Sequence, residues 1–197
     1  MQMRAIIVHR WDVKPQDDWY PWLKQELTAS GFKVEVPEMP RTEAPVIKEW
    51  VEKLAQVVGE PDRQTFLVGH SIGCQTIIRY LATLTENQKA GGGLLVAPWI
   101  HLVNLEGPES EAIAKPWTET PIDWLKAKKH AAKFTCLFSD NDPWVPVAEA
   151  EIFKKNLGAE CRILPNQGHF TAKQSEVVKD GFLHIIQVLW KGTSGYE

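Results

Sequence analysis

One serine of this 197-residue chain stands in a pattern that suits nucleophilic chemistry. Ser71 is the centre of the sequence GHSIG at residues 69–73, which follows the apolar residues 65–68 and precedes an amphipathic pattern. A tight turn between a strand and a helix would push the hydroxyl out of the sheet edge. The helix N-terminus would then offer free N–H groups to an oxyanion, and the two glycines would allow close backbone approach. We therefore predict that Ser71 is a nucleophile.

A serine hydroxyl is a weak nucleophile until a base takes its proton. Among the histidines after Ser71, His169 stands in a loop directly after a predicted strand, and an imidazole can accept and return a proton near neutral pH. A carboxylate is also needed to hold the imidazole in the productive tautomer. Asp140 and Asp142 both follow the predicted strand at residues 134–138, and the residues alone leave both open for this task.

Apolar runs and their spacing predict the elements that would position these side chains. The predicted strands are residues 4–9, 32–36, 65–68, 94–97, 134–138 and 161–164. The predicted helices are residues 18–30, 44–58, 71–81, 122–130, 147–157 and 173–190. This alternation predicts an α/β fold, a three-layer α/β/α sandwich around a mostly parallel six-stranded sheet. The carboxyl ends of such strands share one edge, where Ser71, His169 and one of the two aspartates would meet.

Several boundaries follow from breaker residues. Residues 98–121 contain glycine and prolines without clear periodicity, which predicts a long loop with a functional purpose. The three successive glycines at 91–93 predict a turn, and Asp18 is the expected N-cap of the first helix. We expect a single domain over residues 1–191, followed by a short polar tail at residues 192–197.

Composition is that of an ordinary globular protein. Apolar residues make up 44% of the chain, charged residues 24%, and the formal net charge is −3. This charge gives no electrostatic basis for binding nucleic acid or an anionic membrane, and no apolar run is long enough for a signal peptide or membrane span. The three cysteines lack metal-ligand spacing and indicate a reducing setting. We therefore expect a cytoplasmic protein without a metal site.

The segments around the acid and base candidates resemble those of α/β-hydrolases. The sequence DPWVP at residues 142–146 is similar to the Asp-x-x-Val-Pro of that superfamily, whose aspartate is catalytic, and NQGHF at residues 166–170 is similar to its catalytic Gly-His. The order serine, aspartate, histidine is also that of the superfamily. The resemblance therefore favours Asp142 over Asp140, which we interpret as a turn-stabilising side chain.

A narrower resemblance covers residues 4–191. The sequences DWYPWLK at 18–24, PEMP at 37–40 and GHF at 168–170 are similar, in order and spacing, to those of small lidless serine hydrolases grouped with retinoblastoma-binding protein nine and YdeN-like proteins. This resemblance implies a minimal α/β-hydrolase fold without the two leading strands of larger hydrolases. It also implies that the protein hydrolyses small esters, thioesters or amides, so the expected partner is a small-molecule acyl substrate. Acyl-enzyme chemistry on Ser71 needs no cofactor.

The remaining site residues are expected near the strand ends. The backbone N–H of Ile72 is the expected first oxyanion donor, and Trp11 the expected second. This chain has Arg10 where family members often have glycine, so the loop that would carry the second donor departs from the family pattern. The candidate substrate-binding residues are His9, Arg10, Trp99 and Trp144. For His9, an equal alternative is a hydrogen-bonding residue at a strand end. We interpret His70 as a residue that packs rather than reacts.

A second interpretation belongs to another class of protein. The chain would be a protein-interaction module on a retained hydrolase scaffold, with its aromatic loops bound to a partner that the sequence does not identify. The complete set of Ser71, Asp142 and His169 argues against it, because a pure binder has no need of all three side chains. Since residues 98–121 are few compared with a lid domain, we expect small, soluble substrates rather than long-chain lipids.

Overall fold

The computed structural model describes residues 2–191, so the predicted polar tail at residues 192–197 lies outside the described part. Within it, six strands form one sheet in the order β2-β1-β3-β4-β5-β6, and every neighbouring pair is parallel. The strands are β1 (Arg4–Val8), β2 (Lys33–Glu35), β3 (Thr65–His70), β4 (Gly92–Val96), β5 (Phe134–Ser139) and β6 (Glu160–Leu164). The predicted parallel sheet is confirmed, with no antiparallel pair among the described strands.

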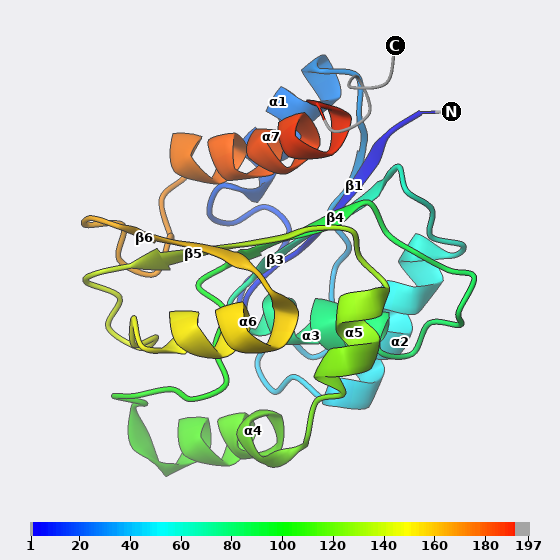
Figure 1. Cartoon of the computed structure of the whole chain (residues 1–197). Coiled ribbons are helices and arrows are strands. Elements are labelled where there is room, and N and C mark those ends of the chain that lie inside the picture. The colour runs from blue at the N-terminus through cyan, green and yellow to red at the C-terminus, as the bar shows by residue number, and fades with distance from the viewer. Residues whose placement is uncertain (1, 192–197) are drawn as a thin grey trace.

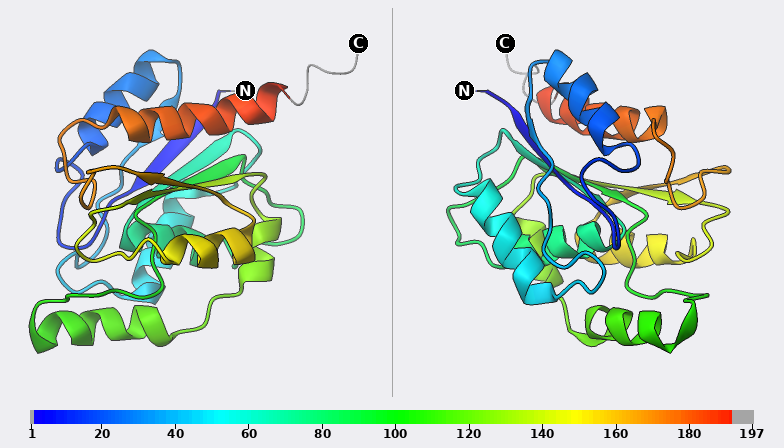
Figure 2. Two further views of the ribbon diagram at one scale, coloured as in Figure 1. Left: turned by 60° about the vertical axis from the view of Figure 1, so that its left-hand side comes forward. Right: turned by 180° about the vertical axis from the view of Figure 1, so that it is seen from behind.

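Helices cover both faces of the sheet, which confirms the three-layer arrangement (Figures 1 and 2). The helices α1 and α7 lie on one face, and α2, α3, α5 and α6 lie on the other, with α4 farther out. Their bounds are α1 (Tyr20–Ala29), α2 (Ile47–Val58), α3 (Ile72–Leu81), α4 (Gly107–Glu119), α5 (Trp124–Lys129), α6 (Glu149–Leu157) and α7 (Glu176–Lys191). Among residues 2–191, no helix is long and apolar enough to cross a bilayer.

The central strands form the core because both of their faces are covered. Every residue of β3, β4 and β5 is buried, as are residues 5–8 of β1, whereas the edge strands β2 and β6 are partly exposed. This burial explains why the central strands appear in the sequence as continuous apolar runs without alternation. Between the sheet and the α1/α7 layer, the rings of Phe32, Phe66 and Phe182 pack edge to face.

The predicted turn at residues 91–93 is wrong for its last two glycines, which belong to β4. Their role is close packing rather than chain reversal. A Cβ atom on Gly92 would lie 2.7 Å from Ile185 Cγ2, and one on Gly93 would lie 3.0 Å from the ring of Phe134. The first distance is shorter than real Cβ contacts, and the second is tight. Glycine at these two positions therefore lets α7 and the adjacent strand pack closely.

The prediction that residues 98–121 form a loop is also wrong, because α4 occupies residues 107–119. Gly107 and Pro108 open this helix, where a missing proline N–H costs nothing, so the residues interpreted as breakers are a start signal. Pro116 lies inside the helix near its end. Trp117 then packs as a fully buried side chain, and its indole N–H donates to the carbonyl of Pro45. Tertiary contacts of this kind hold a segment whose local periodicity is weak.

Asp18 is not the N-cap of the first helix. The helix α1 begins at Tyr20 with Trp19 as its N-cap residue, and that residue makes no side-chain capping bond. Asp18 has a left-handed backbone, with φ of +46°, and its carboxylate accepts a 2.7 Å hydrogen bond from Arg10 Nε. A charged partner from the loop after β1 therefore outweighs the local capping preference.

Candidate active site

Ser71 occupies a strained turn between β3 and α3. Its backbone has φ of +54° and ψ of −117°, a conformation that costs a non-glycine residue about 1–3 kcal/mol. Two backbone bonds hold it there: the Ser71 N–H donates to the Val96 carbonyl at 2.8 Å, and the Ser71 carbonyl accepts the Cys74 N–H at 2.9 Å. The turn leaves Ser71 at the N-terminus of α3, whose first N–H groups have no partner within the helix.

The two glycines of the turn are required by close backbone approach. A Cβ atom on Gly69 would lie 2.8 Å from Cys74 Cα, and one on Gly73 would collide with the carbonyl oxygen of Val8. The helix α3 therefore starts directly against β1 and against its own preceding strand. Because this packing requires glycine at both positions, the pattern GHSIG predicts the turn from residue spacing alone.

His169 is held by Asp142 rather than by Asp140. The distance from His169 Nδ1 to Asp142 Oδ2 is 2.7 Å, and both side chains are almost completely buried. Asp142 Oδ1 accepts the backbone N–H groups of Trp144 and Val145 at 2.9 and 3.1 Å. Because the carboxylate is fixed at both oxygens, it can hold the imidazole in the tautomer that leaves Nε2 free to accept a proton.

Asp140 instead stabilises the loop that carries His169. Its Oδ1 accepts the Asn166 N–H at 2.8 Å, while Asn141 Oδ1 accepts the Gly168 N–H and Ser139 Oγ accepts the intervening N–H of Gln167. The last residue of β5 and the two residues that follow it thus bind three successive amides of the loop after β6. This arrangement fits the interpretation of Asp140 as a turn-stabilising side chain.

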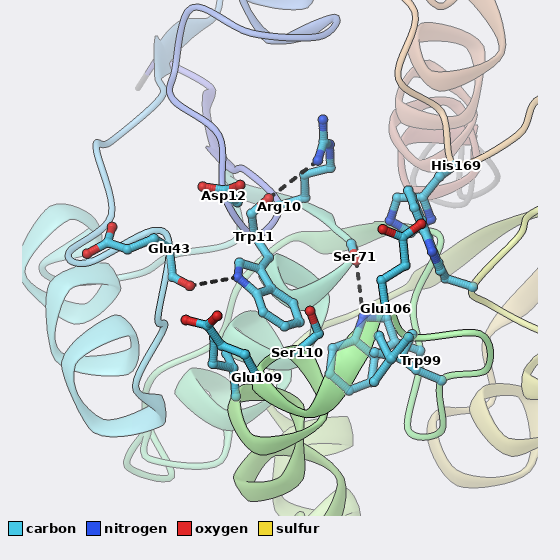
Figure 3. A pocket seen from close by; sticks show the side chains of 14 residues that line it. Arg10, Trp11, Asp12, Glu43, Ser71, Trp99, Glu106, Glu109, Ser110 and His169 are labelled. Carbon is cyan, nitrogen blue, oxygen red and sulfur yellow. Dashed lines mark hydrogen bonds between the residues drawn. The ribbon is translucent and has the colours of Figure 1, made fainter.

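Ser71 and His169 line one cavity of about 490 Å³ (Figure 3). Three tryptophans that the sequence singles out, Trp11, Trp99 and Trp144, line the same cavity. The indole N–H of Trp99 donates to Ser71 Oγ at 3.1 Å, a contact with the candidate nucleophile that the sequence reasoning missed. The Trp144 ring lies edge-on to the ring of His169, with centroids 5.0 Å apart. Trp99 and Trp144 therefore contact the candidate catalytic side chains and also line the cavity.

Two residues that sequence reasoning did not identify fix the position of Trp99. Gln75 Nε2 donates to the Trp99 carbonyl at 3.1 Å, and the buried carboxylate of Glu149 accepts the N–H of Ile100 at 2.5 Å. Glu149 also contacts His101 Nδ1 at 2.9 Å. A glutamate near the start of a helix and a glutamine on an apolar helix face are ordinary in sequence. Only their buried partners mark them as part of the site.

One wall of the cavity comes from the segment expected to be a loop. Residues of α4 and of the segment before it line the cavity: Leu102, Leu105, Glu106, Glu109, Ser110 and Ile113. Figure 3 shows Glu109 and Ser110 beside Trp11. Asp12, Glu43 and Arg10 are further charged residues of the lining. The cavity thus has apolar and aromatic walls with an excess of negative charge.

His9 does not line the cavity, contrary to its predicted substrate contact. Its ring is fully buried: Nδ1 lies 2.8 Å from the Arg10 carbonyl, and Nε2 accepts the Met39 N–H at 3.1 Å. Burial lowers its pKa below the ordinary value of 6.5. His9 is therefore the hydrogen-bonding residue at a strand end, the alternative interpretation. Among residues 2–191, no group of three or more His, Cys, Asp and Glu side chains is arranged to hold a metal ion.

Comparison with known proteins identifies the class to which this fold and site belong. Residues 5–177 match the profile of a family described as Serine hydrolase, and the chain belongs to this family. Similar sequences include YdeN of Bacillus subtilis, which is 26% identical over 170 residues, 86% of this chain and 87% of YdeN. Serine hydrolase RBBP9 of Rattus norvegicus is 25% identical over 153 residues, 77% of each chain. The expected YdeN/RBBP9-like family is confirmed.

Solved structures show the same fold. The crystal structure of the ydeN gene product from B. subtilis matches with a TM-score of 0.84 at 24% identity, covering 94% of this chain and 99% of that one. A carboxylesterase structure from Nitrososphaera gargenis matches with a TM-score of 0.73 at 14% identity, covering 97% and 92%. The predicted α/β-hydrolase fold is confirmed. Family and fold together support hydrolase activity on a small-molecule substrate.

Proposed function

We propose that this chain hydrolyses small carboxylic esters through an acyl-enzyme on Ser71. The observation that carries the proposal is that Ser71 and His169 line one cavity while Asp142 holds His169 at 2.7 Å. In this proposal His169 is the base, Asp142 the orienting acid and Ser71 the nucleophile. The serine hydrolase family and the strained turn at Ser71 support it.

Acylation begins when His169 Nε2 takes the Ser71 hydroxyl proton as Oγ attacks the ester carbonyl. The resulting oxyanion would be stabilised by the N–H of Ile72, the first residue of α3, and by the N–H of Trp11. The Arg10 N–H is already donated to Tyr20 Oη, so Trp11 is the next donor along that loop. The imidazolium then gives its proton to the alcohol oxygen as the C–O bond breaks, and the alcohol leaves.

Deacylation repeats these steps with water. His169 accepts a proton from a water molecule as the water oxygen attacks the acyl carbonyl. His169 then returns this proton to Ser71 Oγ as the carboxylic acid departs. Trp99 has a further part in this step, since its indole N–H points at Ser71 Oγ and stabilises negative charge on that oxygen while it leaves. The Ser71 hydroxyl proton passes to His169 in the substrate complex, because catalytic hydrogen bonds tighten in that state.

Labelling with a fluorophosphonate probe tests the nucleophile. We expect the native protein to be labelled at Ser71, and Ser71→Ala to be unlabelled with at least about a 10⁴-fold loss of kcat/KM on p-nitrophenyl acetate. Ser110→Ala is the matched control, because Ser110 lines the same cavity and should leave labelling unchanged. An unlabelled native protein, or a labelled Ser71→Ala variant, would contradict the proposal and favour the protein-interaction module.

The neighbouring aspartates provide a second control for the same mechanism. Asp142→Asn should lower kcat by roughly 10⁴-fold, because an amide presents the wrong group to His169 Nδ1. Asp140→Asn keeps an oxygen for the Asn166 N–H and should retain activity within about threefold of the native protein. Equal losses in the two variants would show that Asp142 is not the orienting acid.

A further inference from the structure

Four hydrogen-bonded groups connect the loop after β1 with the loop that carries His169. The Arg10 N–H donates to Tyr20 Oη at 3.1 Å, and Tyr20 Oη lies 2.7 Å from His70 Nδ1. His70 Nε2 lies 2.8 Å from the carbonyl oxygen of His169. Tyr20 and His70 are both fully buried, and His70 directly precedes the nucleophile. The chain of bonds therefore passes beside Ser71, with one end at the Arg10 N–H and the other at the carbonyl of the proposed base His169.

The direction of these bonds follows from what each atom can do. The His169 carbonyl can only accept, so His70 carries its proton on Nε2. Burial lowers the pKa of His70 well below its ordinary value, and the nearby His169 and Arg10 lower it further, so Nδ1 stays unprotonated near neutral pH. Nδ1 then accepts the Tyr20 hydroxyl proton. Asp18 Oδ2 is the longer alternative acceptor for that proton, at 3.3 Å.

Each end of the chain of bonds meets a part of the backbone that must be placed accurately. Arg10 precedes Trp11, whose N–H is the proposed second oxyanion donor. The residues on either side of His169 both have positive φ values, +53° at Gly168 and +54° at Phe170. Glycine adopts a positive φ without strain, but Phe170 keeps this conformation only where surrounding contacts determine it. A hydrogen bond from His70 to the His169 carbonyl restrains the peptide that carries the proposed base.

We propose that Tyr20 and His70 are positioning residues that hold residues 10–11 and residues 166–170 in register on either side of Ser71. This inference rests on the proposed function. The alternative is that the two side chains only satisfy each other's polar groups in the core. The two cases differ in their kinetics, because misplaced catalytic groups lower kcat more than they weaken substrate binding.

Tyr20→Phe removes the central hydroxyl while keeping the ring. We expect kcat to fall about tenfold, the size of one or two lost hydrogen bonds, with KM changed less than about twofold. Tyr80→Phe is the matched control, because the Tyr80 hydroxyl is buried without a hydrogen-bond partner among the described residues. It should retain native kcat. Equal kcat in all three proteins, or equal losses in the two variants, would overturn the proposal.

Two substitutions of His70 separate its two bonds. His70→Gln keeps an N–H near the position of Nε2 and so can still donate to the His169 carbonyl. His70→Asn keeps an acceptor near Nδ1 for Tyr20 but loses that donor. We expect His70→Gln to retain at least about fivefold more kcat than His70→Asn, since the donor acts directly on the His169 loop. The reverse order would overturn the proposal.

A spectroscopic measurement on the native protein does not depend on the variants folding. Long-range ¹H–¹⁵N correlation spectra of the histidine side chains should show His70 as the neutral Nε2–H tautomer from pH 6 to pH 8. An Nδ1–H tautomer or a charged ring in this range would overturn the proposal. Fluorophosphonate labelling of the native protein separates the two claims, because an unlabelled native protein defeats the proposed function itself. A labelled protein in which Tyr20→Phe retains native kcat defeats only the positioning inference.

Discussion

His9 and His70 show how burial fixes the charge of a single residue. Both rings are fully buried, and desolvation of the imidazolium is the largest cause that lowers each pKa below 6.5. His70 lies only 3.9 Å from Asp18, but that carboxylate is already bound by Arg10 Nε at 2.7 Å. His70, the residue next to the proposed nucleophile, is therefore a neutral hydrogen-bonding group. This agrees with the sequence interpretation that His70 packs rather than reacts.

A lowered histidine pKa makes stability depend on pH. The unfolded chain binds protons on these rings at pH values where the folded chain does not, so the stability contribution is fully present above about pH 6.5 and is lost as pH falls toward the folded-state value. We expect the free energy of unfolding to decrease by up to about 1.4 kcal/mol per pH unit for each ring below pH 6.5. Urea denaturation at several pH values should show a shallower decrease for His70→Gln. Parallel curves for the two proteins would contradict this prediction.

At the level of elements, α3 holds the end of α4 through one arginine. Arg79 lies on α3, and its guanidinium donates to the carbonyls of Trp117, Thr120 and Pro121 at 2.8–3.2 Å. It also donates to the amide oxygen of Gln75, the residue that holds the Trp99 carbonyl. Burial lowers the pKa of Arg79 to about 10, which still leaves it a cation at neutral pH. The cation thus satisfies carbonyls at a helix C-terminus, where positive charge is favourable.

Replacing Arg79 should loosen α4 and the cavity wall that it forms. We expect Arg79→Ala to lower the free energy of unfolding by about 3 kcal/mol, because several carbonyls lose a charged donor. Arg79→Lys should recover only part of this loss, since an ammonium cannot span the same oxygens. Lys115→Ala, an exposed change on α4, should stay within about 0.5 kcal/mol of the native value. Denaturant titration measures all three, and an Arg79→Ala variant as stable as Lys115→Ala would refute this anchoring.

For the whole molecule, the charge around the cavity matters more than the net charge of −3. The residues that line the cavity include four acids, Asp12, Glu43, Glu106 and Glu109, and one cation, Arg10, which is itself paired with Asp18. A cavity of one dominant sign attracts opposite charge and repels like charge, and salt screens the effect. Ester substrates that carry a negative charge should therefore be disfavoured.

Matched esters test this field. We expect kcat/KM for an acetate ester with a trimethylammonium group on its alcohol to exceed that of an equally long ester with a carboxylate by about tenfold or more at low ionic strength. The ratio should shrink in 0.5 M NaCl and in Glu109→Gln. A ratio of one at low salt, or a ratio independent of salt, would rule out electrostatic selection.

The sequence alone determined the strands, the turn at Ser71 and the order of Ser71, Asp142 and His169. These features are local: buried parallel strands require apolar runs, and the turn requires glycine on both sides of the serine. Tertiary structure alone decided that α4 forms a cavity wall, that Trp99 contacts Ser71, and that Tyr20 and His70 link two loops. The bonds behind these facts join residues up to 99 positions apart, as in His70 to His169. Local periodicity cannot predict such partners, because they meet only when the sheet brings its strand ends together.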